Sequence, residues 1–219
     1  MILAAAAGCL SAPPEATDPG PTVSNCDPFL EDGFDDDGET RNRFEVDEAP
    51  PDSTVDISGG FARIRALGSA ETAGYASLRT GSDHQVASTA LEVVFDSGSV
   101  SGDGAAIILA FDTDGEESFE LGALASGFAI AHDDAGGNTN VVCDPCADFT
   151  DGTWTLRLQE RDGILRFLVG ADGGPLSDLW PGGVAIESQA VYTQIFVVAD
   201  DDGAMAAADL DTISWATCE

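Results

Sequence analysis

The clearest pattern along the chain is an alternation of apolar and polar residues. Residues 154–159 read Trp-Thr-Leu-Arg-Leu-Gln, which is the period of two that a half-buried β-strand requires. A second apolar segment follows at 163–169, and the pair Asp162-Gly163 stands where the two meet. An Asp-Gly pair readily adopts the positive φ angles of a tight turn. These residues are therefore predicted to form a β-hairpin.

A nearly continuous apolar run covers residues 190–198, so that both faces of an extended segment are apolar. This pattern predicts a strand at the centre of a sheet. Almost no window shows the 3.6-residue recurrence of an amphipathic helix. Further strands are expected at residues 43–46, 54–57, 61–67, 74–80, 90–95, 105–111, 118–121, 128–132 and 209–215. About a dozen short strands at regular spacing favour an all-β domain of two stacked antiparallel sheets over a small barrel.

The N-terminal 25 residues depart from this pattern. Residues 10–25 carry four prolines and no apolar periodicity, so we expect a tether there. Residues 1–9 form an Ala-rich apolar stretch that ends in Gly8-Cys9. This stretch resembles the end of a bacterial lipoprotein signal, which is cut before a cysteine that is then acylated. The alternative is an Ala-rich tail with a spare thiol.

Only eight residues, without Lys or Arg, precede Cys9. A secretion signal normally has a charged start and a longer apolar core, so we expect the true start codon to lie upstream. No other stretch approaches the roughly 20 apolar residues of a membrane-spanning helix. The lipid anchor would then be the chain's one contact with a membrane.

The charge of the 219-residue chain is strongly one-sided, with 40 acidic residues against 8 arginines, no lysine and a formal net charge of −32. Such a field repels phosphate groups, and the sequence offers no cluster of basic residues to replace their counterions. We therefore expect neither nucleic-acid binding nor electrostatic docking on anionic lipid. The hydrophobic content of 43% is sufficient for a folded core.

Four motifs occur in an order that carries a resemblance. They are the acidic opening Phe-Leu-Glu-Asp-Gly-Phe-Asp at 29–35, Ser-Gly-Gly-Phe-Ala-Arg-Ile-Arg at 58–65, Gly-Thr-Trp-Thr-Leu-Arg-Leu at 152–158 and the closing strand Ala-Asp-Leu-Asp-Thr-Ile-Ser-Trp at 208–215. Together they resemble the concanavalin A-like lectin/glucanase superfamily. The resemblance implies a jelly-roll β-sandwich over residues 26–219, with the first and last strands side by side. It does not imply sugar binding by itself, since a fold does not determine function.

In such a sandwich Cys26 and Cys218 would be neighbours, so the resemblance implies a disulfide between them. We expect Cys143 and Cys146 to close a small loop, whereas half of a zinc site or a redox motif is the alternative use of this Cys-x-x-Cys pair. Two bridges and one acylated Cys9 would account for all five cysteines. An exported, oxidising location follows from that assignment.

Glucan-cleaving enzymes of the resembling superfamily carry Glu-x-Asp-x-x-Glu, or a shorter form, on one strand of the concave face. The segment 45–48, Glu-Val-Asp-Glu, lacks the final Glu, and the segment 116–120, Glu-Glu-Ser-Phe-Glu, lacks the central Asp. Neither is a complete set of catalytic carboxylates. We therefore expect a protein that is not an enzyme.

Calcium is the one cofactor that the acidic loops suggest, because calcium takes several oxygen ligands from loops. Asp112, Asp114 and Glu116 are weak candidates for such a site. The alternative is that these residues are solvated and serve only the geometry of a turn.

Sugars are recognised by aromatic rings that stack on them and by polar groups that bond their hydroxyls. Five aromatic residues qualify by type: Trp154, Trp180, Trp215, Tyr75 and Tyr192. Trp154 and Trp215 have the strand parity of core residues, so Trp180, in a predicted loop, is the tentative ligand-binding aromatic. A loop Trp tucked under its own hairpin is the alternative.

The loop that contains Asp133, Asp134 and Asn138 would supply polar contacts to the ligand. These observations favour an exported, lipid-anchored, lectin-like binding or adhesion module in a bacterial cell envelope, at the outer membrane or cell surface. Its partner would be a glycan or another surface protein. The alternatives are a divergent glycan hydrolase or lyase on the same fold, and a structural envelope lipoprotein without a small ligand.

Overall fold

A computed structural model describes residues 26–49, 53–68, 73–80, 84–101, 106–113, 117–124, 127–134, 139–148, 150–187, 190–199 and 204–218. Cys9, the tether at 10–25, Asp114, Glu116 and Asn138 lie outside these residues. No helix in the described ranges is long and apolar enough to cross a membrane.

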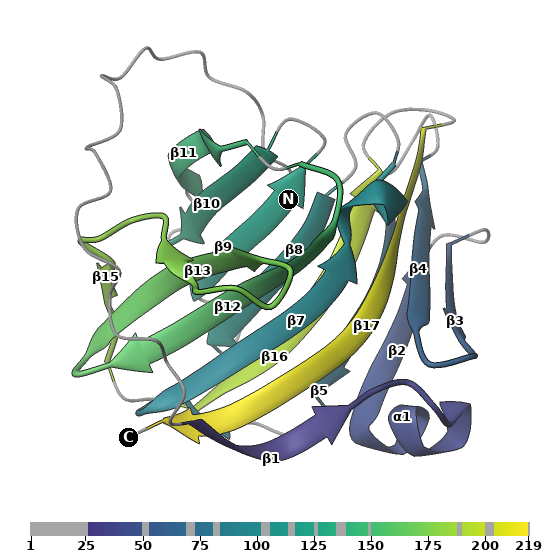
Figure 1. The fold of residues 1–219 in the computed structure, drawn as a ribbon, viewed down its shortest axis with the longest axis horizontal. Helices are drawn as coiled ribbons and strands as arrows, with labels where there is room; N and C mark the ends of the chain where they lie inside the picture. Colours follow the sequence, from purple (N-terminus) through teal and green to yellow (C-terminus); the bar gives the residue numbers. More distant parts are fainter. Residues whose placement is uncertain are drawn as a thin grey trace.

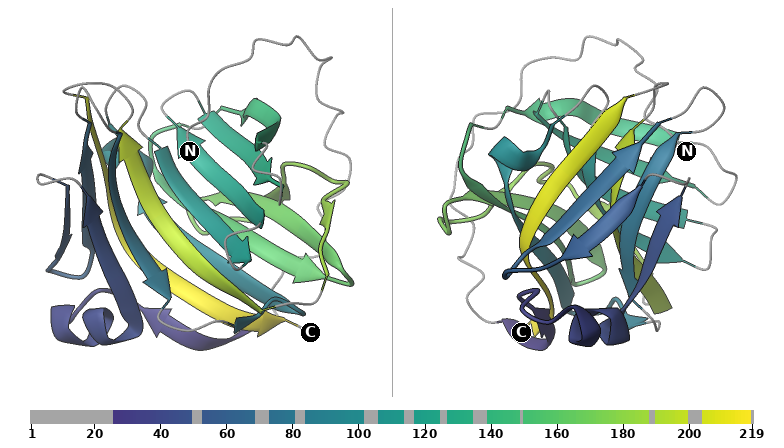
Figure 2. Two further views of the ribbon diagram at one scale, coloured as in Figure 1. Left: turned by 180° about the vertical axis from the view of Figure 1, so that it is seen from behind. Right: turned by 90° about the vertical axis from the view of Figure 1, so that its right-hand side faces the viewer.

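The described residues fold into two antiparallel sheets that pack face to face (Figures 1 and 2). The larger sheet has the order β14-β13-β12-β7-β17-β4-β3, with β1 beside β17 and β15 beside β13. Its strands are β1 (Cys26–Asp32), β3 (Thr54–Ile57), β4 (Ala62–Leu67), β7 (Thr89–Asp96), β12 (Thr153–Arg161), β13 (Ile164–Ala171), β14 (Ser177–Asp178), β15 (Val184–Ala185) and β17 (Met205–Cys218).

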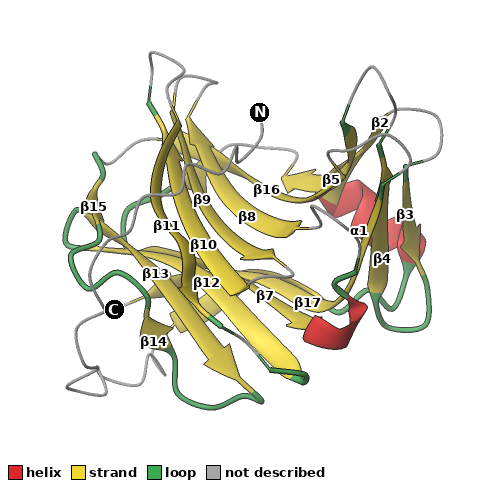
Figure 3. Cartoon of the chain, turned by 90° about the horizontal axis from the view of Figure 1, so that it is seen from above, coloured by secondary structure: helices red, strands yellow, loops and turns green. Residues whose placement is uncertain are grey.

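The second sheet has the order β11-β10-β9-β8-β16-β5-β2, with β6 beside β16. Its strands are β2 (Phe44–Ala49), β5 (Gly74–Thr80), β6 (His84–Gln85), β8 (Ala106–Thr113), β9 (Glu117–Leu124), β10 (Gly127–Asp133), β11 (Thr139–Ala147) and β16 (Ala190–Ala199). The sheet is strongly curved, so that β2 and β5 stand across from β8, β9 and β10 (Figure 3).

The core lies between the two sheets and follows from the alternation in the sequence. Leu156 and Leu158 of β12 are fully buried, and so is Trp215 of β17. The predicted hairpin is present, because β12 pairs with β13 through a turn in which Asp162 has φ 56° and Gly163 has φ 78°. The all-β jelly-roll sandwich is thus confirmed.

In the described residues the structure adds one α-helix that apolar periodicity did not predict, α1 (Asp37–Arg43), and a single-turn 3-10 helix, η1 (Ser97–Ser99). Asp36 caps the start of α1 by accepting a hydrogen bond from the backbone N–H of Glu39 at 3.1 Å. Acidic residues occupy the first turn and arginines the last, as the helix dipole favours. Charge and capping, rather than an apolar stripe, define this helix.

Asp32, the last residue of β1, forms hydrogen bonds that hold α1 against the end of this strand. Its buried carboxylate accepts hydrogen bonds from the Phe34 N–H at 2.8 Å, the Thr40 hydroxyl at 3.0 Å and the Arg43 guanidinium at 3.2 Å. Phe34 is fully buried with φ 57°, a conformation that non-glycine residues rarely adopt. Since β2 begins directly after α1, this carboxylate also fixes where β2 joins the edge of the curved sheet.

Two disulfides are present. Cys26 and Cys218 are direct partners in the register of β1 with β17, and their bridge joins residues 192 positions apart. The second bridge joins Cys143 to Cys146. These are the two pairs that the sequence analysis expected.

The surroundings of Cys143 and Cys146 differ from the expected small loop, because both residues belong to β11. The register of β10 with β11 shifts between the pairs Phe128↔Ala147 and Ile130↔Cys143. A bulge of this kind at an edge strand accommodates Pro145, which cannot donate to a β-ladder.

Candidate functional site

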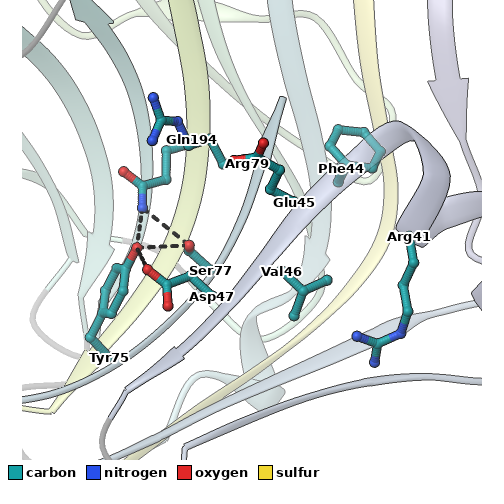
Figure 4. A pocket seen from close by; sticks show the side chains of 9 residues that line it. All are labelled: Arg41, Phe44, Glu45, Val46, Asp47, Tyr75, Ser77, Arg79 and Gln194. Atoms are coloured by element: carbon teal, nitrogen blue, oxygen red, sulfur yellow. Dashed lines mark hydrogen bonds between the residues drawn. The ribbon is translucent and has the colours of Figure 1, made fainter. Parts of the chain in front are cut away.

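The curved sheet has one face toward the core and one face away from it, which we call its outer face. The outer face carries a pocket of about 570 Å³. Its walls come from the end of α1 and from three neighbouring strands, β2, β5 and β16. The lining residues are Arg41, Phe44, Glu45, Val46, Asp47, Tyr75, Ser77, Arg79 and Gln194 (Figure 4).

Strand parity explains why polar groups gather there. On β5 the buried Ala76 and Leu78 face the core, so Tyr75, Ser77 and Arg79 face outward. The register of the sheet then places these side chains in rows across it: Asp47 is opposite Ser77, while Glu45 and Gln194 are opposite Arg79 from its two sides.

A hydrogen-bond network holds four of the lining side chains. The Gln194 amide donates to the Tyr75 hydroxyl and, at 3.1 Å, to the Ser77 hydroxyl. The Tyr75 and Ser77 hydroxyls lie 2.9 Å apart, and Tyr75 also donates to Asp47 at 3.4 Å. Figure 4 shows these side chains pointing toward one another. Burial raises the pKa of Tyr75, so its phenol remains protonated and able to donate.

Arg79 is held differently. Its guanidinium carbon lies 3.7 Å from the centroid of the Tyr192 ring, in the geometry of a cation–π contact. The Nε atom of Arg79 is buried and has no hydrogen-bond partner among the described residues. Tyr192, which qualified by type as a sugar-stacking residue, is thus covered by Arg79.

A second polar group, the carboxylate cluster of Asp112, Glu120 and Asp133, lies further along the same outer face. Asp112 on β8 and Asp133 on β10 are both direct partners of Ser118 on β9, and Glu120 follows Ser118 by two positions. Burial, and then the charges of Asp133 and Asp112, raise the pKa of Glu120 to about 7. Burial likewise raises the pKa of Asp112, which a hydrogen bond from Ser118 opposes.

A carboxyl group that titrates near neutrality beside other carboxylates is suited to proton transfer. The cluster is therefore a chemically capable group on the same face as the pocket. Its members do not appear among the residues that line the pocket.

The structure does not assemble the expected calcium ligands into a site that can be described. Asp112 lies on β8 as part of the carboxylate cluster, while Asp114 and Glu116 fall outside the described residues. Within the described ranges no group of three or more His, Cys, Asp or Glu side chains could hold a metal ion.

Trp180, the tentative ligand-binding aromatic, follows β14 and is half-buried. Its ring lies 6.2 Å from that of Phe167 in the core, and its backbone N–H donates a hydrogen bond to the Asp178 carboxylate at 3.0 Å. The ring of Trp180 thus packs against Phe167 of the larger sheet. Asp133 belongs to β10 of the other sheet.

The two remaining tryptophans also pack with the core. Trp215 is fully buried. Trp154 is half-buried, with its ring 5.1 Å from that of Phe128 and its indole N–H donating to the Thr150 carbonyl at 2.8 Å. Asp134, the second acidic residue of the expected binding loop, is half-buried directly after β10.

In the sequence, residue type alone marks Tyr75 as a candidate, and no local motif marks Arg79 or Gln194 as a ligand contact. The available signal was parity, since all three occupy the polar positions of predicted strands at 74–80 and 190–198. Their proximity could not be predicted, because Tyr75 and Gln194 are 119 residues apart in the chain.

The fold is similar to those of solved glucanase-like structures. A β-1,3-glucanase from Mycobacterium marinum matches with TM-score 0.59 at 15% identity, over 86% of this chain and 98% of that chain. A pseudo β-1,3-glucanase and immunostimulatory antigen of Mycobacterium tuberculosis matches with TM-score 0.58 at 12% identity, over 88% and 99% of the two chains.

The catalytic domain of an endo-1,3-β-glucanase (laminarinase) from Thermotoga petrophila matches with TM-score 0.60 at 11% identity, over 90% and 100% of the two chains. No family model matches the sequence, and no curated protein matches it. At these identities the likeness establishes the fold, a concanavalin A-like jelly roll.

Proposed function

We propose that the outer face of the curved sheet binds a glycan without cleaving it. The observation that carries this proposal is the pocket network, in which Tyr75, Ser77, Gln194 and Asp47 converge beside an aromatic ring. Sugars need such a combination of a ring surface and fixed hydrogen-bonding groups. The volume of about 570 Å³ also falls within the usual range of small-ligand sites.

Binding is favoured over hydrolysis by where the carboxyl groups of the pocket lie. Glu45 and Asp47 are both exposed to solvent, whereas a general acid normally needs a desolvated environment that raises its pKa. The solved neighbours include one that is described as a pseudo-glucanase, so this fold also occurs without that activity.

The experiment is a glycan array followed by calorimetric titration of the best oligosaccharide. We expect Gln194→Ala to weaken binding by about tenfold or more, because it removes the donor that links Tyr75 to Ser77. Gln85→Ala is the matched control, because Gln85 is exposed on β6 and does not line the pocket. Binding that is equal in both variants would refute this location.

Glycan hydrolysis is the second candidate, and one observation favours it: Glu120 has a pKa of about 7 between Asp112 and Asp133. Such a residue would protonate a leaving group at neutral pH. Release of reducing ends from β-linked glucans that is abolished by Glu120→Gln and retained by Glu45→Gln would support hydrolysis. No release at any pH between about 4 and 8, the range over which carboxyls titrate, would exclude it for the substrates tested.

We also propose that the protein is exported and anchored by an acylated Cys9. The two disulfides support an oxidising compartment, and the Ala-rich stretch before Cys9 supports acylation. In cells that express the natural gene, the intact mass is expected to include a lipid on Cys9. In a detergent phase partition, the wild type should enter the detergent phase and the variant Cys9→Ser should remain in the aqueous phase. An unmodified Cys9 in the native protein would contradict the lipid anchor.

A further inference from the structure

We infer that the pocket prefers glycans with free amino groups over neutral glycans, and neutral glycans over uronate or sulfated glycans. This inference rests on the proposed function and adds the charge class of the ligand. It follows from the distribution of charge over the outer face of the curved sheet, from the partners of the two arginines at the pocket, and from the exposure of the two pocket carboxylates.

Acidic groups outnumber basic groups on this face. Among the described side chains of its strands, five carboxyl groups point outward: Glu45 and Asp47 on β2, Asp112 on β8, Glu120 on β9 and Asp133 on β10. Arg79 is the one arginine in the strands of this sheet, and the chain contains no lysine. A ligand on this face therefore meets a negative field, which the net charge of −32 reinforces over longer distances.

The two arginines at the pocket do not neutralise its carboxylates. Arg41 donates to Asp37 at 2.7 Å and to the Val55 carbonyl at 3.1 Å, and it stands apart from the hydrogen-bond network in Figure 4. Arg79 stacks on Tyr192, and its charge lowers the pKa of Asp112. Both positive charges are thus directed to partners other than Glu45 and Asp47.

Glu45 and Asp47 are therefore the open acceptors of the pocket. Both are exposed, and all eight arginines lie in the described residues, yet neither carboxylate forms an ion pair with any of them. From the described part of the chain Asp47 receives one hydrogen bond, the long 3.4 Å contact from Tyr75. Its remaining acceptor sites face the pocket, next to the phenol ring on which a sugar would stack.

A protonated sugar amine matches this arrangement. An ammonium group carries three donors and a positive charge, which the carboxylate of Asp47 or Glu45 would accept. A uronate or sulfate would instead bring negative charge to these carboxylates, and such like-charge contacts discriminate against a ligand. An uncharged sugar would retain the hydrogen bonds of Tyr75 and Gln194 without either effect.

The test uses three oligosaccharides of equal length: glucosamine, its N-acetylated form and galacturonate. Calorimetric titrations of the full chain are made at about pH 5.5, where exposed carboxyls are ionised and sugar amines are protonated. We expect the glucosamine oligomer to bind at least about fivefold more tightly than the N-acetylated form, the effect of one favourable surface ion pair. This advantage should shrink at high salt, and the galacturonate oligomer should bind most weakly.

Two variants locate the effect. Asp47→Asn should reduce the affinity for the glucosamine oligomer by about fivefold and leave that for the N-acetylated form nearly unchanged. Asp56→Asn removes the same charge from an exposed position of β3 in the opposite sheet, so it should alter neither affinity by more than about twofold.

Equal affinity for the three oligosaccharides, or tighter binding of galacturonate, would overturn the charge preference and leave glycan binding intact. A preference for glucosamine that Asp47→Asn does not reduce would overturn the role of this carboxylate. Absence of binding by all three, together with a negative glycan array, would overturn the proposed function and this inference with it.

Discussion

At Glu120, burial and neighbouring charges act together on a proton equilibrium. Its carboxyl group is half-buried on β9, and the neighbouring charges of Asp133 and Asp112 oppose its ionisation. The pKa rises from an ordinary 4.5 in the unfolded chain to about 7 in the folded protein. A carboxyl whose pKa is raised by folding stabilises the folded state fully below the unfolded pKa, and this contribution is lost as the pH rises through the folded pKa.

The variant Glu120→Gln should therefore change the pH dependence of stability. Glutamine resembles the protonated carboxyl and does not ionise, so the variant avoids the cost of a buried charge. Between pH 5 and pH 8 the wild type should lose roughly 2 to 3 kcal/mol of unfolding free energy relative to the variant. Urea unfolding of both proteins at the two pH values measures this difference.

The control for this prediction is Glu45→Gln, which removes a carboxyl from an exposed position on the same sheet. Its stability relative to the wild type should vary little over the same interval. If Glu120→Gln behaves like the control, the environment assigned to Glu120 is wrong.

At the scale of elements, β1 and β17 illustrate how the termini of the domain are held. The strands pair from Cys26↔Cys218 to Asp32↔Ile213, and the disulfide joins their outermost residues. A bridge that closes almost the whole domain removes far more freedom from the unfolded chain than the bridge between Cys143 and Cys146, which closes a loop of four residues.

Removal of the long-range bridge should thus be the more damaging change. On the chain-entropy account the double variant C26S/C218S should lose up to about 5 kcal/mol, whereas C143S/C146S should lose about 2 kcal/mol. Denaturant unfolding of the two double variants compares them directly. A larger loss for C143S/C146S would show that the short bridge supports β11 in a way that loop closure does not describe.

The sequence was most informative where local chemistry decides the structure. The Asp162-Gly163 turn and the alternation before it predict the β12–β13 hairpin, because both signals act within a few residues. Helix α1 escaped prediction because it spans seven residues and is stabilised by Asp36 and by charges rather than by an apolar stripe. The capping residue and the charges at the two ends of the helix could have predicted it, but a search for apolar periodicity does not consider them.

The candidate site could be predicted only in part. The outward parity of Tyr75 and Gln194 follows from their strands, but the register that brings β5 beside β16 depends on the packing of the whole sandwich. Similarly, Glu120 belongs to the segment 116–120, which is an incomplete catalytic motif. Its raised pKa depends on Asp112 and Asp133 of the neighbouring strands, which no local pattern connects to it.

For the whole molecule, the dominant property is the imbalance between 40 acidic residues and 8 arginines. The arginines form local pairs, including Arg63 with Asp209, Arg157 with Glu92 and Arg166 with Asp178, all on the larger sheet. Forty acidic residues outnumber the eight arginines by five to one, so mutual repulsion among carboxylates opposes the compact state. Salt screens both the repulsion among carboxylates and the attraction within ion pairs. Because the repulsion is larger, salt should stabilise the folded state.

The midpoint of thermal unfolding should therefore rise by several degrees between about 0.1 M and 1 M sodium chloride, as the Debye length falls from about 10 Å to 3 Å. Differential scanning calorimetry measures the shift, and a series with an uncharged osmolyte separates screening from preferential exclusion. A midpoint that falls with salt would mean that the ion pairs outweigh the net repulsion.

Glycan binding by the pocket on the curved sheet can be measured in one titration series. The glycan that binds the wild type best is titrated into Tyr75→Ala and into Trp180→Ala, after both variants are shown to unfold cooperatively. If the glycan binds in this pocket, Tyr75→Ala should lose at least about tenfold in affinity, because it removes a ring and a bonded hydroxyl from the pocket. Trp180→Ala should bind with an affinity near that of the wild type. Loss of binding in Trp180→Ala with retention in Tyr75→Ala would contradict binding in this pocket.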